Sequence, residues 1–397
     1  MVRRFPFLKT LRIVTTLLAI LILLFAMTTS TRVPLHQRVL VQGIGVDRTD
    51  SGQFHVTVQA VSTSASTSVE VYETDGDSVF DALNNITLVS GKTPFYTHNS
   101  ILILGRQCAE SGLTDVMDFF VRHHQTRPAE NVFLAKDKAG DILTLKSDPQ
   151  ITMNNQQLQT NQYVLASQIE QLASAGDLNS QLLEVQVMDV ANDLYSESCD
   201  VFLPVLSIEE KQIAVRGCAV FSGDKLKAIL SGNDTVLIKA VQDQLTGGAV
   251  QISLDDGTKA TLSFLHSNCE TKASLRDNVP HFDLTLSCEM NIDEIARPMA
   301  EKQSIRDFEA LQKAADKKIR SVLSQSLDTL LYKEKVDVLC LSKTLLHQQT
   351  DWWKQNEKQW HEILPHCTYS VTVNSTITAE GQEMSPQTIE PFSTGKA

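Results

Sequence analysis

The sequence lacks the cysteine patterns that mark disulfide-rich or zinc-binding proteins. Its 397 residues include seven cysteines, an odd number, and no two of them form a C-x-x-C pair. Neither a disulfide framework nor a zinc site is therefore indicated. Glycine (17), proline (11) and aromatic residues (6%) are also sparse, which excludes fibrous and low-complexity chains. With 42% hydrophobic and 21% charged residues, the chain is typical of folded globular protein, and its length favours more than one domain.

Motifs for the common enzyme classes are absent as well. No G-x-S-x-G elbow, H-E-x-x-H helix or kinase signature occurs. The Gly91-Lys92-Thr93 triplet resembles the end of a phosphate-binding loop, but the glycine required five positions earlier is Ile86. Gly43 and Gly45 resemble the start of a dinucleotide fingerprint, whose third glycine is here Arg48. We predict no cofactor, no metal and no catalytic residue, and we interpret the chain as a binding or assembly protein rather than an enzyme.

An excess of positive charge is also missing. The net charge is −12, and it becomes −16 without the four basic residues among the first 12. Binding to nucleic acid neutralises phosphates with clustered lysine and arginine, so nucleic acid is excluded as a partner.

One long apolar run is present near the start. A basic head (residues 1–12) precedes Ile13–Met27, which has no charged residue. As a helix this run covers about 22 Å, and residues up to Thr31 extend it toward the roughly 30 Å of a bilayer core. We predict a transmembrane anchor at 13–31, with the head in the cytoplasm and the body outside. A cleaved secretory signal is the alternative, but Ala26 and Thr28 make a poor cleavage pair.

Hydrophobic periodicity divides the exported body into strands and helices. Within residues 39–200 the periodicity predicts the order strand, strand, helix, strand, helix, strand, followed by two more helices. The predicted segments in this part are strands at 39–47, 54–60, 101–104 and 131–135, and helices at 77–91, 113–121, 163–172 and 182–194. This order indicates a mixed sheet packed against helices. A small, polar loop is expected at 62–68.

Residues 201–385 predict a second domain, which we expect to subdivide near 248 or 295. Strands are predicted at 201–208, 212–221 and 226–230, and Asp256-Gly257 marks a hairpin within 251–265. Apolar and polar residues alternate strictly over 282–292, which is typical of an antiparallel sheet with one face buried and the other exposed to solvent. A long amphipathic helix follows from Pro298 to Leu331, then two shorter helices at 336–349 and 351–364 and a last strand at 369–377. Residues 386–397 form a polar tail that we expect to be mobile. The predicted fold class is α+β, with a multi-domain body of mixed and antiparallel sheets.

Trp352, Trp353 and Trp360 are the candidate site residues, as a partner surface. All three tryptophans of the chain lie in this stretch, and neighbouring residues of one helix do not share a face. We therefore expect either Trp352 or Trp353 to be exposed or to lie at an interface.

The histidines and the remaining cysteines offer weaker candidates. His123 and His124 are expected at a helix C-terminus, where the dipole favours a cation. His361, His366, Cys340 and Cys367 fit no usual zinc spacing. Cys288 is expected to be a buried thiol. Disulfides are possible, for example between Cys199 and Cys218, but the spacing of the cysteines does not indicate which of them pair.

Several segments resemble one family. The segments VLVQGIGVD, Gly76–Gly105 and Ser111–Leu143 are similar to the N-terminal domain of the spore germination protein C subunits, the GerAC-type family. Arg216–Leu230 and Glu334–Trp360, with the strand after them, resemble its C-terminal region. These segments contain no catalytic motif, so they indicate common ancestry with the family and do not point to an active site.

The resemblance implies a non-enzymatic C subunit of a nutrient germinant receptor in the spore inner membrane. Such a subunit lies outside the membrane beside integral membrane subunits of the A and B type. Whether it touches the germinant is left open. Relatives usually carry a lipidated cysteine after their signal, whereas the first cysteine here is Cys108, so a peptide helix would have to replace the lipid. The alternative function is an exported, membrane-anchored solute-binding or cell-envelope hydrolase protein.

Overall fold

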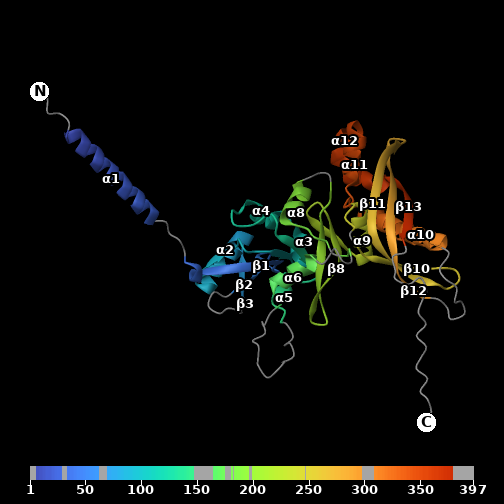
Figure 1. The fold of residues 1–397 in the computed structure, drawn as a ribbon, viewed down its shortest axis with the longest axis horizontal. Coiled ribbons are helices and arrows are strands. Elements are labelled where there is room, and N and C mark those ends of the chain that lie inside the picture. The colour runs from blue at the N-terminus through green and yellow to red at the C-terminus, as the bar shows by residue number, and fades with distance from the viewer. Residues whose placement is uncertain are drawn as a thin grey trace, which may run out of the picture.

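The computed structural model describes residues 6–28, 34–61, 69–146, 164–174, 180–181, 183–195, 199–245, 247–296 and 308–378. Two sheets lie side by side along the long axis of the molecule, and helix α1 (Pro6–Thr28) stands apart from them (Figure 1). The expected loop at 62–68 and tail at 386–397 fall outside the described residues.

The first sheet has nine strands in the order β3-β2-β1-β5-β6-β7-β8-β9, with β4 paired to β1. Its strands are β1 (Arg38–Arg48), β2 (Phe54–Val61), β3 (Val69–Gly76), β4 (Thr93–Phe95), β5 (Ile101–Leu104), β6 (Asn131–Ala135), β7 (Phe202–Glu209), β8 (Gln212–Ser222) and β9 (Lys225–Leu230). The central strands β1, β5, β6 and β7 are parallel, and antiparallel strands extend both ends. The mixed sheet predicted for this part is confirmed.

Helices cover both faces of the first sheet. Leu102 and Leu104 of β5 point into a core that includes residues of α2, α3, α4 and α8. Ile101 and Ile103 point to the other face, into a smaller core with residues of α5 and α6. All four residues of β5 are buried, as expected for an unbroken apolar run covered on both sides. The helices are α2 (Val79–Ser90), α3 (Arg106–Ser111), α4 (Thr114–Arg122), α5 (Ala139–Leu143), α6 (Ala166–Ser174) and α8 (Val187–Tyr195).

Gly43 and Gly45 have a packing role in β1 instead of a nucleotide-binding role. A Cβ atom added at Gly43 would lie 3.0 Å from the Cβ of Ala166 in α6. One added at Gly45 would lie 3.2 Å from the Cβ of Ala139 in α5. The two glycines therefore let α5 and α6 approach the sheet closely.

The second sheet has the order β10-β11-β12-β13. β10 (Ala249–Ser253), β11 (Lys259–Arg276) and β12 (Val279–Ala296) are antiparallel neighbours, and the predicted hairpin turn at Asp256-Gly257 joins the first two. β13 (Thr368–Thr378) pairs parallel with β12, so our expectation of an antiparallel sheet is wrong for this pair. The reason lies in the connection: the helical segment between β12 and β13 brings the chain back to the end of the sheet where β12 begins.

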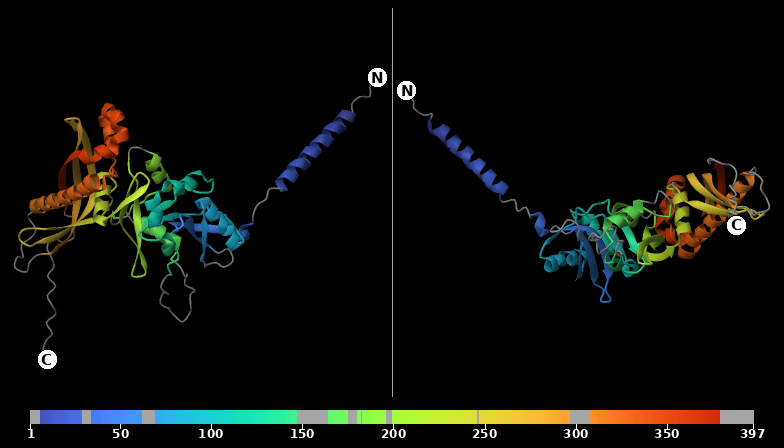
Figure 2. Two further views of the ribbon diagram at one scale, coloured as in Figure 1. Left: turned by 180° about the vertical axis from the view of Figure 1, so that it is seen from behind. Right: turned by 60° about the horizontal axis from the view of Figure 1, so that its bottom comes forward.

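Helices cover one side of this sheet. α10 (Phe308–Leu327) lies across it between β13 and β10, as the two views of Figure 2 show. The long helix predicted from Pro298 begins at Phe308 in the described residues and continues as a π-helical segment, Asp328–Glu334. The remaining helices are α9 (Gly232–Val241), α11 (Leu341–Gln348), α12 (Thr350–Asn356) and α13 (Trp360–Ile363).

The N-terminal run is helical, as predicted, from Pro6 to Thr28. Among the described residues, none of the helices meets the length and apolarity required of a membrane span. The spanning role expected for 13–31 therefore stays a prediction. The domain boundary expected at 200 also stays a prediction, and the first sheet continues beyond it to Leu230 in β9.

Candidate functional site

The candidate site lies where two chain segments far apart in sequence meet. Asp200 precedes β7 and Asp337 precedes α11. The backbone N–H of Asp337 donates to Oδ2 of Asp200 at 2.7 Å, and the backbone N–H of Asp200 donates to the carbonyl of Asp337 at 3.2 Å. These reciprocal bonds join the first half of the chain to the helices that follow α10. We call Cys199, Asp200, Asp337, Cys340 and Trp360 the junction.

Asp337 organises the start of α11. Its carboxylate accepts backbone N–H bonds from Leu341 at 2.8 Å and Ser342 at 2.9 Å, which satisfies two of the free donors at the helix N-terminus. It also accepts a bond from Nε1 of Trp360 at 3.0 Å. The carboxylate of Asp337 thus ties α11 to α13, and its backbone N–H and C=O tie both to the Asp200 segment.

A disulfide lies beside these carboxylates. Cys199 and Cys340 are bonded, with their Cα atoms 4.8 Å apart and a sequence separation of 141. The spacing of the cysteines leaves their pairing open, and Cys199 with Cys218 is only one of the pairings that it allows. Cys218 is instead a free thiol buried in β8.

Burial dominates the electrostatics of the junction. It raises the pKa of Asp200 and of Asp337, and in each case backbone N–H donors oppose the shift. Asp193 of α8 borders the same region, and burial raises its pKa to about 6 although Lys343 opposes this. His361 places its Nε2 3.7 Å from Oδ1 of Asp200, and its side chain is half exposed.

The junction encloses a cavity of about 50 Å³, lined mainly by Asp193, Cys199, Asp200, Trp360 and His361. Ligand-binding pockets are typically about 300–1,000 Å³. This space suits a water molecule and is too small for a sugar or an amino acid.

The three tryptophans do not form an exposed surface. Trp352, Trp353 and Trp360 are 9%, 3% and 2% exposed, so our expectation that Trp352 or Trp353 is exposed is wrong. Trp352 donates from Nε1 to the carbonyl of Asn278, in the turn between β11 and β12. Trp353 packs edge-on against Trp360, with ring centroids 5.4 Å apart. The short helix α12 is therefore enclosed on two sides, which buries neighbouring residues. Whether this stretch meets a partner stays a prediction.

The other candidates also lack reactive geometry. Burial raises the pKa of the thiols of Cys108, Cys218, Cys288 and Cys367 to about 12, which disfavours the nucleophilic thiolate. No group of three or more metal-binding side chains occurs in the part of the chain that the structure describes. His123 is the C-cap residue of α4, as predicted, but burial lowers its pKa and so disfavours the cation that we expected there.

Sequence reasoning missed the junction. An aspartate shortly before a helix is a recognisable capping signal. The helix that we predict at 336–349 begins one residue before Asp337, so the prediction places Asp337 inside the helix instead of ahead of it. The pairing of Asp337 with Asp200 spans 137 positions and has no local signature. The carboxylates of Asp200 and Asp337 accept bonds from backbone and indole donors, so the arrangement can fasten the two chain segments together.

Glu130 is a second buried carboxylate, and it gives a prediction for pH dependence. Its oxygens accept bonds from Asn99 Nδ2 at 2.7 Å and from the backbone N–H of Arg127 at 2.9 Å, and its side chain is fully buried. Burial raises its pKa from 4.5 to about 7. Since the folded state holds the proton more tightly than the unfolded state, the resulting stability is complete below about pH 4.5 and is lost as the pH rises through 7.

We expect the free energy of unfolding to fall by roughly 2–3 kcal/mol more in the wild type than in Glu130→Gln between pH 5 and 8. The glutamine fits because Asn99 can turn its amide, whose Oδ1 makes no hydrogen bond in the described structure. Urea unfolding of both proteins at several pH values measures the difference. Parallel curves for the two proteins would show that Glu130 does not titrate in this range.

Comparison with known families identifies the architecture. Residues 31–208 match the family described as "Spore germination protein N-terminal domain". Residues 216–381 match the one described as "Spore germination B3/ GerAC like, C-terminal". The chain belongs to the GerAC-type spore germination family. The resemblance inferred from the sequence is thus confirmed.

Relatives and a solved structure agree with this assignment. The chain is 21% identical to spore germination protein B3 of Bacillus subtilis (strain 168), over 86% of this chain and 91% of the relative. It is 19% identical to spore germination protein GerQC of Bacillus cereus, over 71% and 74%. A crystal structure of the GerBC protein has the same fold, with a TM-score of 0.54, 18% identity, and coverage of 87% of this chain and 99% of that one.

The two family regions are joined within one sheet. The first region ends at residue 208 in β7 and the second begins at residue 216 in β8. These two strands are hydrogen-bonded neighbours from Phe202–Val220 to Glu209–Gln212. The GerAC-type halves therefore share the first sheet, and the junction fastens them a second time.

Proposed function

We propose that this chain is the non-enzymatic C subunit of a spore nutrient germinant receptor. The observation that carries the proposal is the match of both GerAC-type regions, in order, over most of the chain. The junction supports a role without catalysis, since its carboxylates are occupied by backbone and indole donors. The subunit acts by assembling with integral membrane subunits of the A and B type.

We further propose that α1 tethers the subunit to the spore inner membrane, with its N-terminus in the cytoplasm and its body on the outer side. The described apolar side chains of α1 are 49–63% exposed on all sides of the helix, which favours a lipid environment over water. Such a helix would replace the lipidated cysteine of relatives. A mature N-terminus near Thr31, measured by mass spectrometry, would contradict this part of the proposal.

Exposed apolar side chains support assembly through the first half of the body. Three helices on one side of the first sheet, α2, α4 and α8, carry them: Phe80, Leu88, Val89, Val121, Met188 and Tyr195. Large exposed apolar residues gathered on neighbouring helices are typical of a protein interface. This surface is a better candidate for subunit contact than the buried tryptophans.

Deleting the gene tests the proposal. We expect spores without this subunit to lose germination in response to at least one amino acid or sugar, measured as the fall in optical density of a spore suspension. Reintroducing the wild-type gene should restore the response. Germination that is unchanged with every nutrient would contradict the proposal. Turnover of a cell-wall fragment by the purified chain would instead favour the hydrolase alternative.

A further inference from the structure

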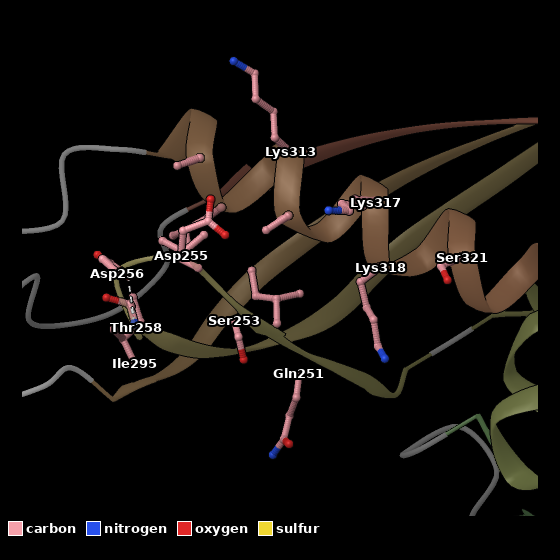
Figure 3. Close-up of a pocket in the computed structure, with 15 residues that line it drawn as sticks. Gln251, Ser253, Asp255, Asp256, Thr258, Ile295, Lys313, Lys317, Lys318 and Ser321 are labelled. Atoms are coloured by element: carbon pink, nitrogen blue, oxygen red, sulfur yellow. Dashed lines mark hydrogen bonds between the residues drawn. The ribbon is translucent and has the colours of Figure 1, made fainter.

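A groove on the described surface lies at the free edge of the second sheet. It has a volume of about 810 Å³ and runs between β10 and α10. β10 is the end strand of the sheet, with β11 on one side only. Figure 3 shows the groove, with α10 above and β10 below.

The backbone of β10 presents unused hydrogen-bonding groups to this edge. The backbone N–H of Leu254 donates to the carbonyl of Thr258, and that of Phe264 donates to the carbonyl of Gly248. These two bonds show which residues of β10 are hydrogen-bonded to β11. Even-numbered residues of β10 therefore bond to β11, and Ala249, Gln251 and Ser253 point their N–H and C=O groups outward. No described residue makes a backbone hydrogen bond to Gln251 or Ser253 at this edge.

The walls of the groove define what it would accept. Ile252 and Leu311 form an apolar floor and are 3% and 2% exposed. Lys317 and Lys318 of α10 are exposed, and neither is ion-paired with a described carboxylate. Lys318 extends from α10 toward β10, whereas Lys313 points away and pairs with Glu309. Asp255 and Asp256 lie at the opposite end of the groove.

We propose that this groove binds an extended acidic segment of a partner protein, which adds a strand to the edge of β10. Its backbone would pair with Ala249, Gln251 and Ser253, as in recognition by strand addition. Its carboxylates would lie beside Lys317 and Lys318, and its uncharged or basic end beside Asp255. A second copy of this chain is a weaker occupant. The five residues of β10 span only about 17 Å, and a stable interface buries roughly 1,000 Å² or more.

The test uses the full-length chain in detergent and two labelled eight-residue peptides. One has glutamate at alternate positions of one half and threonine elsewhere, and the other has lysine at the same positions. Fluorescence anisotropy should detect binding of the glutamate peptide, at least tenfold tighter than binding of the lysine peptide. Gln251→Pro should weaken it at least tenfold. This proline removes an outward N–H and leaves the bonds to β11 in place, so the melting temperature should be nearly unchanged.

A pair of lysine variants provides the matched control. Lys317→Gln/Lys318→Gln should weaken binding of the glutamate peptide about tenfold, because two charge pairs of up to about 1 kcal/mol each are lost. Lys313→Gln, on the same helix but pointing away, should bind as the wild type does. No binding at 1 mM peptide, or equal binding by wild type and Gln251→Pro, would overturn the proposal. So would self-association in sedimentation that Gln251→Pro abolishes, since the edge would then belong to a second copy.

Discussion

Replacing Asp337 with leucine is expected to lower the free energy of unfolding by about 3–5 kcal/mol. The leucine has a similar size but accepts no hydrogen bond. The backbone N–H groups of Leu341 and Ser342 and the indole N–H of Trp360 would all lose their acceptor. Asp337 is 1% exposed, so water cannot easily replace it. Each buried donor left without a partner costs about 1–3 kcal/mol.

Urea unfolding of the full-length chain measures this loss, with Asp351→Leu as the matched control. Asp351 is an exposed aspartate in the first turn of α12, so the same chemical change there should cost less than about 1 kcal/mol. Trp360→Phe removes one of the three donors and should cost about 1 kcal/mol through that bond. If Asp337→Leu and Asp351→Leu are equally stable, Asp337 does not hold the junction.

Local elements of this fold were predictable because their causes are local. Apolar residues alternate with polar ones in β12 because one face of this strand is buried and the other is exposed to solvent. Asp256-Gly257 forms the turn between β10 and β11. The helix expected before Gly91 ends there, since Gly91 adopts a left-handed backbone with φ of 65°. Its predicted start is Asp77, and the observed N-cap is Ser78, whose side chain accepts a hydrogen bond from the backbone N–H of Asp81.

Features set by distant contacts were not predictable. The parallel pairing of β13 depends on where a helical segment brings the chain back to β12. The burial of both Trp352 and Trp353 depends on elements that pack on opposite sides of α12, one of them the turn at Asn278. For the same reason the junction could not be inferred, because Cys199 and Cys340 have no spacing that distinguishes their pairing from others.

Removing the disulfide is the second change with a large expected effect. Cys199→Ala/Cys340→Ala should lower the free energy of unfolding by about 3–5 kcal/mol, because a cross-link over 141 residues restricts the unfolded chain strongly. The chain-entropy relation gives about 5 kcal/mol for such a loop, and native disulfides commonly contribute somewhat less. The change should act mainly on the unfolded state, since the bonds between Asp200 and Asp337 remain.

A variant with glycine at position 340 distinguishes the effect of losing the disulfide from the effect of backbone strain at that position. Cys340 has a φ of 54°, in the left-handed region that costs a side-chain-bearing residue about 1 kcal/mol. Cys199→Ala/Cys340→Gly should therefore be destabilised by about 1 kcal/mol less than the double alanine variant. Dithiothreitol should lower the melting temperature of the wild type and leave both variants unchanged. If reduction leaves the wild type unchanged, the cross-link contributes nothing to stability, and non-covalent contacts such as the shared sheet and the Asp200–Asp337 bonds hold the two halves together.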